Sequence, residues 1–379
     1  MGLFVRSRLQ YLSEYADIHV VAPIPLLDYS NPRGEWARSR GIPRRRTDGR
    51  LEIWHPRWLY PPFGTPLNAF SMYARLNWPL RQLRQVFPFQ LIEAHFGHPE
   101  GVAAAKLARA LGVPFTVTFR GNETRDTGNP ALRRAIAGAV TKAARVITVS
   151  NNLRDLAIAL GAPSTRVKTV PNGINTAIFH AQDRIYAREK HHIPPGARVI
   201  LSAGYLIERK GHHKVIRALK TLADCGVEAQ LLIAGSAGRE GQFEETLHAL
   251  VNETGMRERV RFLGQLPVES LAEVMCAADV LCLASSREGW PNVVHEASGC
   301  GTPVVATNVG GVADMLPGEE YGFVVPVEDE TALEAALERA LLKHWDREAI
   351  ARWGGSRSWE HVAGEVHEQF VEVVRESSA

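Results

Sequence analysis

Residues 279–311, DVLCLASSREGWPNVVHEASGCGTPVVATNVGG, contain a strand, a turn, a helix and a second strand in close succession. The runs Asp279–Ala284 and Pro303–Thr307 have the continuous apolar composition of strands that are buried on both faces. Between them, Pro291 suits the first position of a helix, because its missing N–H is not needed there. The stretch therefore predicts part of a parallel sheet, with a polar turn at the carboxyl edge, where open α/β sheets bind ligands.

Similar apolar runs recur along the whole chain and alternate with amphipathic helical stretches. This alternation is typical of parallel sheets covered by helices on both faces. The polar stretch 175–197 divides the runs evenly, so we expect an α/β fold of two doubly wound, Rossmann-like lobes with a cleft between them. The lobes comprise residues 1–178 and 179–355, and residues 356–379 add a C-terminal helix. The predicted strands are Ile18–Ile24, Leu51–His55, Leu91–Phe96, Pro114–Phe119, Arg145–Val149, Arg166–Val170, Arg198–Gly204, Ala229–Gly235, Arg259–Leu263, Asp279–Ala284, Pro303–Thr307 and Gly322–Val327.

The first lobe opens differently from the second. A doubly wound lobe normally begins with a strand and a glycine turn, and that first strand lies in the middle of the sheet. Here the chain opens directly on a helical pattern, Gly2–Tyr15. We therefore expect the first lobe to lack its first strand and glycine loop.

Composition excludes several classes of protein. Of the 379 residues, 45% are hydrophobic and 22% charged, which excludes wholesale disorder, and no apolar run is long enough to span a membrane. The cysteines have no CxxC spacing, so we expect neither a disulfide framework nor a zinc knuckle, but reduced thiols in a cytoplasmic protein. The absence of a P-loop and of a GxSxG elbow argues against a nucleoside triphosphatase and a serine hydrolase.

The net charge of +3 conceals an asymmetry between the halves of the chain. Residues 1–179 have 24 Lys and Arg against 11 Asp and Glu, whereas residues 180–379 have 20 against 30. Arg33–Arg50 contains seven arginines, and Leu67–Phe87 is apolar and aromatic with interspersed arginines. Such a basic amphipathic segment suits an anionic membrane surface; the alternative is a solvated basic face on a helix that packs against the core. Nucleic acid is not expected as a partner, because no recognised binding module accompanies the charge.

Two glutamates flank the predicted start of the helix after residue 290. Glu288 lies in the turn before the helix and Glu296 lies inside it. The helix N-terminus attracts phosphate through its dipole and its first N–H groups, here those of Asn292 and Val293. An ionised carboxylate only accepts hydrogen bonds, so carboxylates at the two ends of a phosphate cradle suit hydroxyl donors, namely a sugar and a ribose. For either glutamate alone, the alternative role is to complement the helix dipole.

Paired cations follow another predicted strand. The run 198–204 leads into the loop GYLIERKG, in which Arg209 and Lys210 precede the next helix. Cations at this edge can neutralise a diphosphate, the arginine as a planar fork and the lysine as a point charge. Since no Asp-x-Asp pair occurs, we expect no metal bound by such a motif, and the cations would stabilise a leaving diphosphate instead. His212 and His213, which follow Gly211, are expected at the surface.

Together these residues resemble the retaining nucleotide-sugar glycosyltransferases of family 4, whose two-lobed architecture is called GT-B. The resemblance covers nearly the whole chain and rests on the glutamate pair and four motifs: GTPVVATNVGG (301–311), ERKG (208–211), FLG (262–264) and PNGINTAIF (171–179). It implies sugar transfer with retention of anomeric configuration, without a cofactor, and a C-terminal helix that returns to the first lobe. The HPRWLYPPFG and AHFGHPEG segments resemble members that build bacterial surface polysaccharides. The implied partners are a nucleotide-sugar donor and a saccharide or lipid-linked saccharide acceptor at the inner membrane face.

The resemblance also assigns roles to individual residues. Glu296 would hold the nucleotide ribose and Glu288 the hydroxyls of the transferred sugar. Arg209 and Lys210 would contact the diphosphate. Glu288, Lys210 and Arg209 are therefore the catalytic candidates. The further donor-binding candidates are Gly204, Leu263, Gly289, Asn292 and Val293.

Three positions depart from the family pattern. Tyr205 stands where members usually carry an arginine, Arg120 stands where many carry a histidine, and Gly2 alone remains of the glycine loop. The acceptor-side candidates are Arg120, His95 and Gly2. A metal site at His95 and His98 is disfavoured, because these residues lie at a strand-to-helix turn and not on one helix.

Two other functions stay open. A sugar-nucleotide epimerase of the same architecture would convert its substrate without an acceptor. A truncated, non-catalytic protein would bind a nucleotide or a membrane without turnover. Incubation with the donor alone distinguishes the epimerase from a transferase, and donor binding without transfer to any acceptor would favour the non-catalytic protein.

Overall fold

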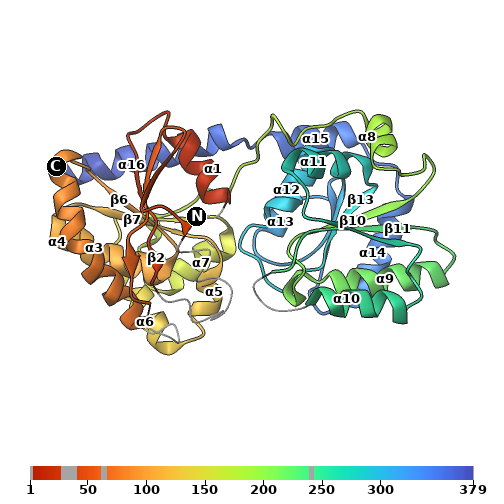
Figure 1. The fold of residues 1–379 in the computed structure, drawn as a ribbon, viewed down its shortest axis with the longest axis horizontal. Helices are drawn as coiled ribbons and strands as arrows, with labels where there is room; N and C mark the ends of the chain where they lie inside the picture. The colour runs from red at the N-terminus through yellow and green to blue at the C-terminus, as the bar shows by residue number, and fades with distance from the viewer. Residues whose placement is uncertain (1–2, 27–40, 61–65, 239–242, 379) are drawn as a thin grey trace. The chain divides into compact units, whose positions relative to one another are not determined.

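The computed structural model describes residues 3–26, 41–60, 66–238 and 243–378, and Figure 1 shows their secondary structure. The chain forms two units, residues 1–172 with 359–379, and residues 173–358. The C-terminal helix α16 (Trp359–Ser378) thus belongs to the first unit. The sequence placed the unit boundaries at 178/179 and 355/356, and the structure has them at 172/173 and 358/359.

The second unit is built on a six-stranded parallel sheet with the order β12-β11-β10-β13-β14-β15. The chain winds outward from β10 to β12 and then restarts beside β10 with β13. This is the doubly wound arrangement that the sequence predicts. The strands are β10 (Val199–Ala203), β11 (Gln230–Ala234), β12 (Val260–Gly264), β13 (Val280–Leu283), β14 (Val304–Thr307) and β15 (Gly322–Val325).

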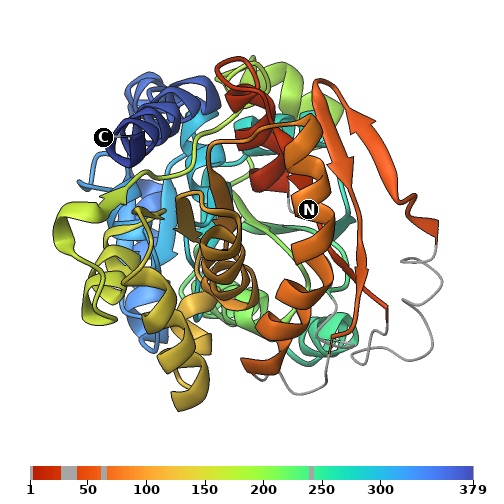
Figure 2. The same cartoon turned by 90° about the vertical axis from the view of Figure 1, so that its left-hand side faces the viewer.

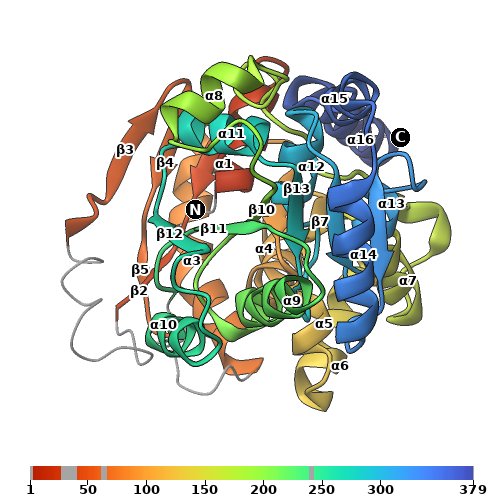
Figure 3. The ribbon, with the colours of Figure 1, turned by 90° about the vertical axis from the view of Figure 1, so that its right-hand side faces the viewer.

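The two faces of this sheet belong to separate hydrophobic clusters, because successive side chains of a strand point to opposite faces. In β10, Leu201 joins one cluster and Ile200 the other, and both are fully buried. Figure 3 shows helices on both sides of the sheet. One side has α8 (Arg184–Lys190), α11 (Val268–Ala277), α12 (Asn292–Gly299) and α13 (Val312–Met315), with α15 (Arg347–Gly355) against α12; the other has α9 (His212–Asp224), α10 (Phe243–Glu253) and α14 (Glu330–Leu342).

The first unit has its strands in separate sheets. A four-stranded parallel sheet has the order β6-β7-β8-β9, and a three-stranded sheet has the order β1-β4-β3 with β3 antiparallel. A short pair, β2 and β5, completes the set of described strands. The strands are β1 (His19–Val21), β2 (Ile24–Pro25), β3 (Arg45–Asp48), β4 (Leu51–Trp54), β5 (Arg57–Trp58), β6 (Ile92–His95), β7 (Phe115–Phe119), β8 (Arg145–Thr148) and β9 (Val167–Thr169).

Hydrophobic clusters join the two larger sheets of the first unit. On one face, Ile53 and Ile147 share a cluster with α16 and α1 (Leu3–Leu12), which lie side by side. On the other face, Trp54 and Ile92 contact a cluster formed by α3 (Pro66–Val86) and α4 (Val102–Leu111). Figure 2 shows the helices of this unit. The described part of this unit also contains the α-helices α5 (Asn122–Asp126), α6 (Pro130–Val140) and α7 (Asn151–Ala159), and short helical turns at Gly97–Gly101 and Ser164–Arg166.

The two larger sheets of the first unit end on strands β1 and β6. The first described element of the chain is α1, and the sheet orders are β1-β4-β3 and β6-β7-β8-β9. Among the described residues, no helix combines the length and apolar character that crossing a bilayer needs.

Candidate functional site

The predicted donor residues gather at the point where the second sheet reverses its strand order. The chain leaves β10 in one direction and β13 in the other, so the loops that follow these neighbouring strands face each other. This switch point at the carboxyl edge is where open α/β sheets bind ligands. Arg209 and Lys210 lie in the loop after β10, and Glu288 lies in the loop after β13.

Lys210 and Glu288 form the central contact of the site. The Lys210 ammonium donates to Glu288 Oε1 over 2.6 Å, and the Ser285 hydroxyl donates to the same oxygen over 2.9 Å. The Arg209 guanidinium lies 3.7 Å from Glu288 Oε2. The Lys210 and Glu288 side chains are only 14% and 10% exposed. Two cations therefore share one carboxylate, which leaves a net positive charge at the carboxyl edge of the sheet.

Backbone contacts fix the two loops against each other. The Ser286 N–H donates to the Arg209 carbonyl over 2.9 Å. Gly211, at φ +73°, presses against Ala284 so closely that a Cβ would overlap its carbonyl group. The Thr307 hydroxyl donates to the Ser285 carbonyl over 2.6 Å. Only glycine fits at position 211, because the space and the left-handed conformation both exclude a side chain.

The second loop leads into the N-terminus of α12. The helix begins at Asn292 with Pro291 at its N-cap, one residue later than the sequence predicts. Asn292 and Val293 form the first turn of the helix, so their N–H groups lie at its positive end. The carbonyl of Gly289 accepts from the Gly311 N–H over 3.0 Å, which holds the turn before the helix. The helix start and the cations are two positive features that adjoin Glu288.

Glu296 lies inside α12 and is half-buried. Burial raises the pKa of its carboxyl to about 7. No charged group contributes to that shift, so the carboxyl has no cation to hold it in its ionised form. Glu288 differs from Glu296 in this respect, because its carboxylate lies close to the cations of Lys210 and Arg209.

His212 is a site residue that the sequence interpretation missed. We expected it at the surface, but it is 1% exposed at the start of α9. Its Nδ1 lies 2.8 Å from the Ser202 hydroxyl and its Nε2 lies 3.2 Å from the Tyr205 carbonyl. Burial lowers the pKa of the imidazole to about 4, so the ring is neutral and Nε2–H donates to Tyr205. The expectation was wrong because a tertiary contact buries the residue.

The remaining donor candidates lie along the same edge of the sheet. Gly204 directly follows β10, and a Cβ there would lie 3.4 Å from the aliphatic chain of Lys210. Tyr205 follows it and is 60% exposed. Leu263 lies on β12, the edge strand, with its side chain partly buried against the core. The structure thus brings Gly204 to Lys210, whereas Leu263 is two strands away from β10.

The acceptor-side candidates Arg120 and His95 contact each other in the first unit. Arg120 Nε donates to His95 Nδ1 over 3.0 Å, and its Nη1 donates to Asn172 Oδ1 over 3.0 Å. Its Nη2 is buried and has no hydrogen-bond partner among the described residues. Burial lowers the pKa of Arg120 to about 9 and holds the pKa of His95 well below its usual value. Gly2 lies outside the described residues, as does part of the arginine-rich stretch, residues 33–40.

Other charged groups surround this pair. Arg8 from α1 is fully buried and bonds the Glu93 carboxylate, which also accepts from the Thr118 hydroxyl. The carboxylate of Glu123 accepts three backbone N–H groups, those of Gly97, Arg120 and Gly121. The sequence did not single out Arg8 or Glu93, because a buried arginine inside a helical pattern has no local signal. The cluster fixes Arg120 at the carboxyl edge of β7.

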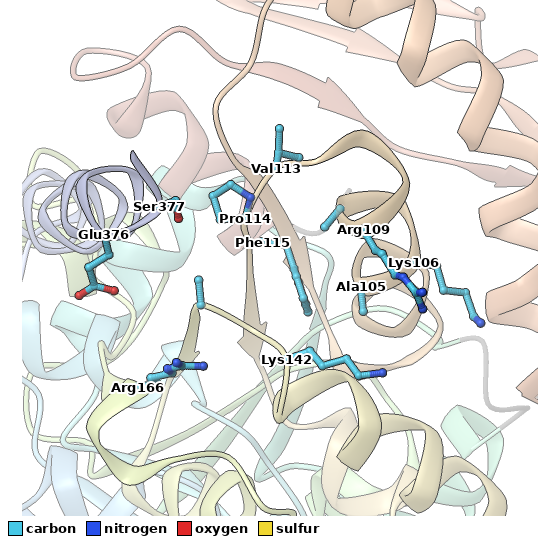
Figure 4. A pocket seen from close by; sticks show the side chains of 12 residues that line it. Ala105, Lys106, Arg109, Val113, Pro114, Phe115, Lys142, Arg166, Glu376 and Ser377 are labelled. Carbon is cyan, nitrogen blue, oxygen red and sulfur yellow. The ribbon is translucent and has the colours of Figure 1, made fainter. Parts of the chain in front are cut away.

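A cavity of about 670 Å³ lies at the opposite, amino-terminal edge of the first unit's sheet. Figure 4 shows its side chains. Arg109 lies in the last turn of α4 and Lys142 lies just after α6, where positive charge complements a helix dipole. Arg109 and Lys142 therefore have a structural explanation, and none of the donor candidates lines the cavity. The lining residues are Ala105, Lys106, Ala108, Arg109, Val113, Pro114, Phe115, Lys142, Ala144, Arg166, Glu376 and Ser377.

Known proteins are similar to this chain in sequence and in fold. The family model described as Glycosyltransferase Family 4 matches residues 10–178, and the one described as Glycosyl transferases group 1 matches residues 183–354. D-inositol 3-phosphate glycosyltransferase 1 of Catenulispora acidiphila is 31% identical over 74% of this chain and 70% of its own length. The D-inositol 3-phosphate glycosyltransferase of Corynebacterium jeikeium is also 31% identical, but the match covers 65% of this chain and only 62% of that protein.

Two solved structures show the same architecture. Sucrose-phosphate synthase from Thermosynechococcus elongatus superposes with a TM-score of 0.80 at 20% identity, over 99% of this chain and 93% of that one. Anabaena HepE in complex with UDP superposes with a TM-score of 0.75 at 18% identity, over 98% and 96%. These likenesses show the two-lobed GT-B fold. By sequence match and fold, the chain belongs to glycosyltransferase family 4, the group 1 glycosyl transferases.

Proposed function

We propose that this protein is a retaining, metal-independent glycosyltransferase that moves a sugar from a nucleotide-sugar to a saccharide acceptor. The observation that carries the proposal is the contact between Lys210 and Glu288 at the switch point of the second sheet. It joins a cation suited to a diphosphate and a carboxylate suited to sugar hydroxyls within 2.6 Å. A donor needs both groups at the place where its sugar and its diphosphate meet.

The donor is a nucleoside diphosphate sugar. Its diphosphate would lie between the two cations, Arg209 and Lys210, and the first N–H groups of α12, which together offset its negative charge. Glu296 would accept hydrogen bonds from the two ribose hydroxyls. The name of the Anabaena structure records bound UDP, and that protein shares the fold of this chain.

The proposed reaction takes place on one face of the sugar. The bond between the anomeric carbon and the diphosphate oxygen breaks, and an acceptor hydroxyl bonds to the same carbon from the same side. Its proton passes to the departing phosphate oxygen, so atoms and charge balance. Lys210 and Arg209 stabilise the negative charge that grows on the leaving diphosphate, and this electrostatic term is usually the largest in such a site.

The proposed reaction needs no metal ion, because Lys210 and Arg209 supply the positive charge. A divalent ion would serve to bind the diphosphate and to offset its charge as it leaves. Lys210 and Arg209 already place two positive charges there, beside the positive end of α12. Addition of a chelator is therefore expected to leave the activity unchanged.

The acceptor is proposed to be a saccharide, carried on a lipid at the inner membrane face, that is bound by the first unit. Arg120 offers an unpaired donor at the carboxyl edge of β7, and His95 holds that guanidinium in place. Residues 1–179 carry the excess of positive charge that an anionic lipid surface attracts.

Incubation of the protein with radiolabelled UDP-, GDP- and ADP-sugars tests the proposal. With a lipid-linked saccharide fraction present, we expect label to move from one donor to the acceptor with the anomeric configuration of the donor. An epimerised sugar nucleotide formed without any acceptor would instead identify an epimerase. Donor binding with no transfer to any acceptor would identify a non-catalytic protein.

A further inference from the structure

We infer that the solvent-facing side of α3 docks on an anionic lipid bilayer. The inference deepens the proposed function, because it identifies the surface that would bring the first unit to a lipid-carried acceptor. Binding to a bilayer requires no donor and no turnover. The docking surface and the proposed activity can therefore fail independently.

The helix α3 has apolar side chains on two opposite faces. One face packs against the core of the first unit through Ala69, Met72, Leu76 and Leu80, all of them buried. On the other, Leu67, Phe70 and Trp78 are 63%, 55% and 68% exposed. With about 3.6 residues per turn, positions 67, 70, 74 and 78 form a single stripe along the helix. We call this stripe, Leu67, Phe70, Ala74 and Trp78, the outer stripe.

A neighbouring residue widens the outer stripe. Leu59 is 59% exposed, and its carbonyl accepts from the Ser71 hydroxyl over 2.6 Å, which holds it beside the first turns of α3. The Phe70 ring also contacts Tyr73. A helix with a single partner normally has a polar outer face. An apolar outer face of this kind, with large side chains gathered on it, marks an interaction surface.

The charges around the outer stripe select an anionic partner. Between Glu52 and Glu93 the sequence contains no Asp or Glu, but it contains Arg57, Arg75, Arg81 and Arg84. Arg75 donates to the Arg57 carbonyl over 2.8 Å, and Arg81 to the Ala110 carbonyl over 2.8 Å. A carbonyl group is neutral, and neither Arg75 nor Arg81 forms an ion pair within the described part of the chain. Both positive charges remain available to phosphate groups.

A lipid surface fits these features better than a second copy of the chain. Two copies of α3 face to face would bring arginines of like charge together, whereas anionic headgroups attract each of them. A tryptophan prefers the interface between headgroups and acyl chains, where Trp78 would lie with Phe70 and Leu67 beside it. An apolar stripe flanked by arginines is the pattern of a helix that lies in that interface.

Co-sedimentation of the full chain with vesicles tests the inference. The probes are vesicles of phosphatidylcholine alone and of phosphatidylcholine mixed equally with phosphatidylglycerol. We expect binding to the mixed vesicles, weaker binding to the neutral ones, and a loss of affinity as salt is added. Substitution of Phe70→Ser with Trp78→Ser should lower the affinity about tenfold or more, since two large apolar groups no longer leave water. Arg75→Gln should lower it several-fold and flatten the salt dependence.

The matched control is Ile185→Ser with Tyr186→Ser. These side chains on α8 are 72% and 61% exposed, as prominent as the outer stripe but far from it along the chain. The control variant should bind vesicles as strongly as the original protein. All variants should have the same melting temperature and, in the absence of vesicles, the same donor affinity. Equal vesicle binding by the Phe70, Trp78 variant and the control would overturn the inference. The inference would also be overturned if the original protein formed a dimer without lipid and only the Phe70, Trp78 variant lost that dimer. The partner of the outer stripe would then be a second copy of the chain.

Discussion

The ammonium of Lys210 and the carboxylate of Glu288 lie 2.6 Å apart, although 78 residues separate them in the chain. They meet because β10 and β13 are neighbours in the sheet and each is followed by a loop at the same edge. The pair is mostly shielded from water, so each charge depends on the other. Removal of either partner therefore changes how the other binds a ligand.

Glu288→Gln should lower turnover about a hundredfold or more without weakening nucleoside diphosphate binding. The amide keeps the shape of the side chain but no longer offsets the charges of Lys210 and Arg209, which then attract the diphosphate at least as strongly. Steady-state rates and calorimetric titration with UDP, GDP and ADP measure the two effects separately. A variant with full turnover would show that Glu288 does not act on the transferred sugar.

Nucleotide affinity should rise with pH between about 6 and 8 through the ionisation of Glu296. Burial raises the pKa of this carboxyl to about 7, and only the ionised form accepts hydrogen bonds from both ribose hydroxyls. One pH unit below that pKa, affinity should be about tenfold lower than well above it. The control is Glu296→Gln, which should show only the smaller dependence due to the phosphates. Identical pH profiles for the two proteins would remove Glu296 from the ribose site.

The raised pKa of Glu296 also predicts an effect on stability. In the unfolded chain the carboxyl ionises near its ordinary pKa of 4.5, whereas in the folded protein it keeps its proton up to about 7. The stability that the protonated form provides is present below 4.5 and is lost as pH rises through 7. Glu296→Gln should therefore raise the melting temperature more at pH 8 than at pH 4.

Gly211→Ala should destabilise the second unit and abolish donor binding. Both Gly211 and Gly226 have a left-handed backbone, at φ +73° and +79°, but a Cβ at 226 meets nothing within 4 Å whereas one at 211 overlaps Ala284. Gly226→Ala should cost about 1–2 kcal/mol of unfolding free energy. Gly211→Ala should cost about 1–3 kcal/mol more, because the loops must separate. Denaturant unfolding monitored by circular dichroism measures both, and equal costs would mean that the loops do not require this close contact.

His212→Phe should raise the KM for the donor with a smaller effect on kcat, because the ring holds the loop that carries Lys210. A phenyl group fills the space but leaves the Ser202 hydroxyl without this partner, and the Tyr205 carbonyl keeps only the Ile207 N–H, at a cost of about 1–3 kcal/mol. His213→Phe is the control, since that half-buried side chain packs on the Phe243 ring. His212→Gln, which keeps hydrogen-bonding groups, should have a lower KM than His212→Phe; an unchanged KM in His212→Phe would show that the ring only fills space.

The sequence predicted every strand of the second unit and the main strands of the first. Runs such as Val280–Leu283 are continuously apolar and buried on both faces, so their composition alone identifies them. The short strand β3 was not predicted, because Arg45–Asp48 is exposed and polar and owes its place to pairing with β4. Local composition therefore predicts strands that are buried in the core. It does not predict exposed strands that form only because they pair with a neighbouring strand.

The same distinction applies to the site. Glu288, Arg209 and Lys210 could be identified because their residue types and their places after strands suit a diphosphate and a sugar. Their direct contact could not, because it depends on the order of strands in the sheet. The burial of His212 also could not be predicted from the sequence, since it is a polar residue at the start of a helix and only tertiary packing encloses it.

The central claim is that the turns after β10 and β13, with Glu296 behind them, bind a nucleoside diphosphate sugar. Calorimetric titration of the protein with UDP, GDP and ADP, in the presence of a chelator, tests it most directly. We expect at least one of the three to bind, Glu296→Ala and Lys210→Ala each to weaken that binding about tenfold or more, and Glu338→Ala, an exposed control on α14, to leave it unchanged. No binding by any of the three, or equal affinity in all four proteins, would contradict the claim.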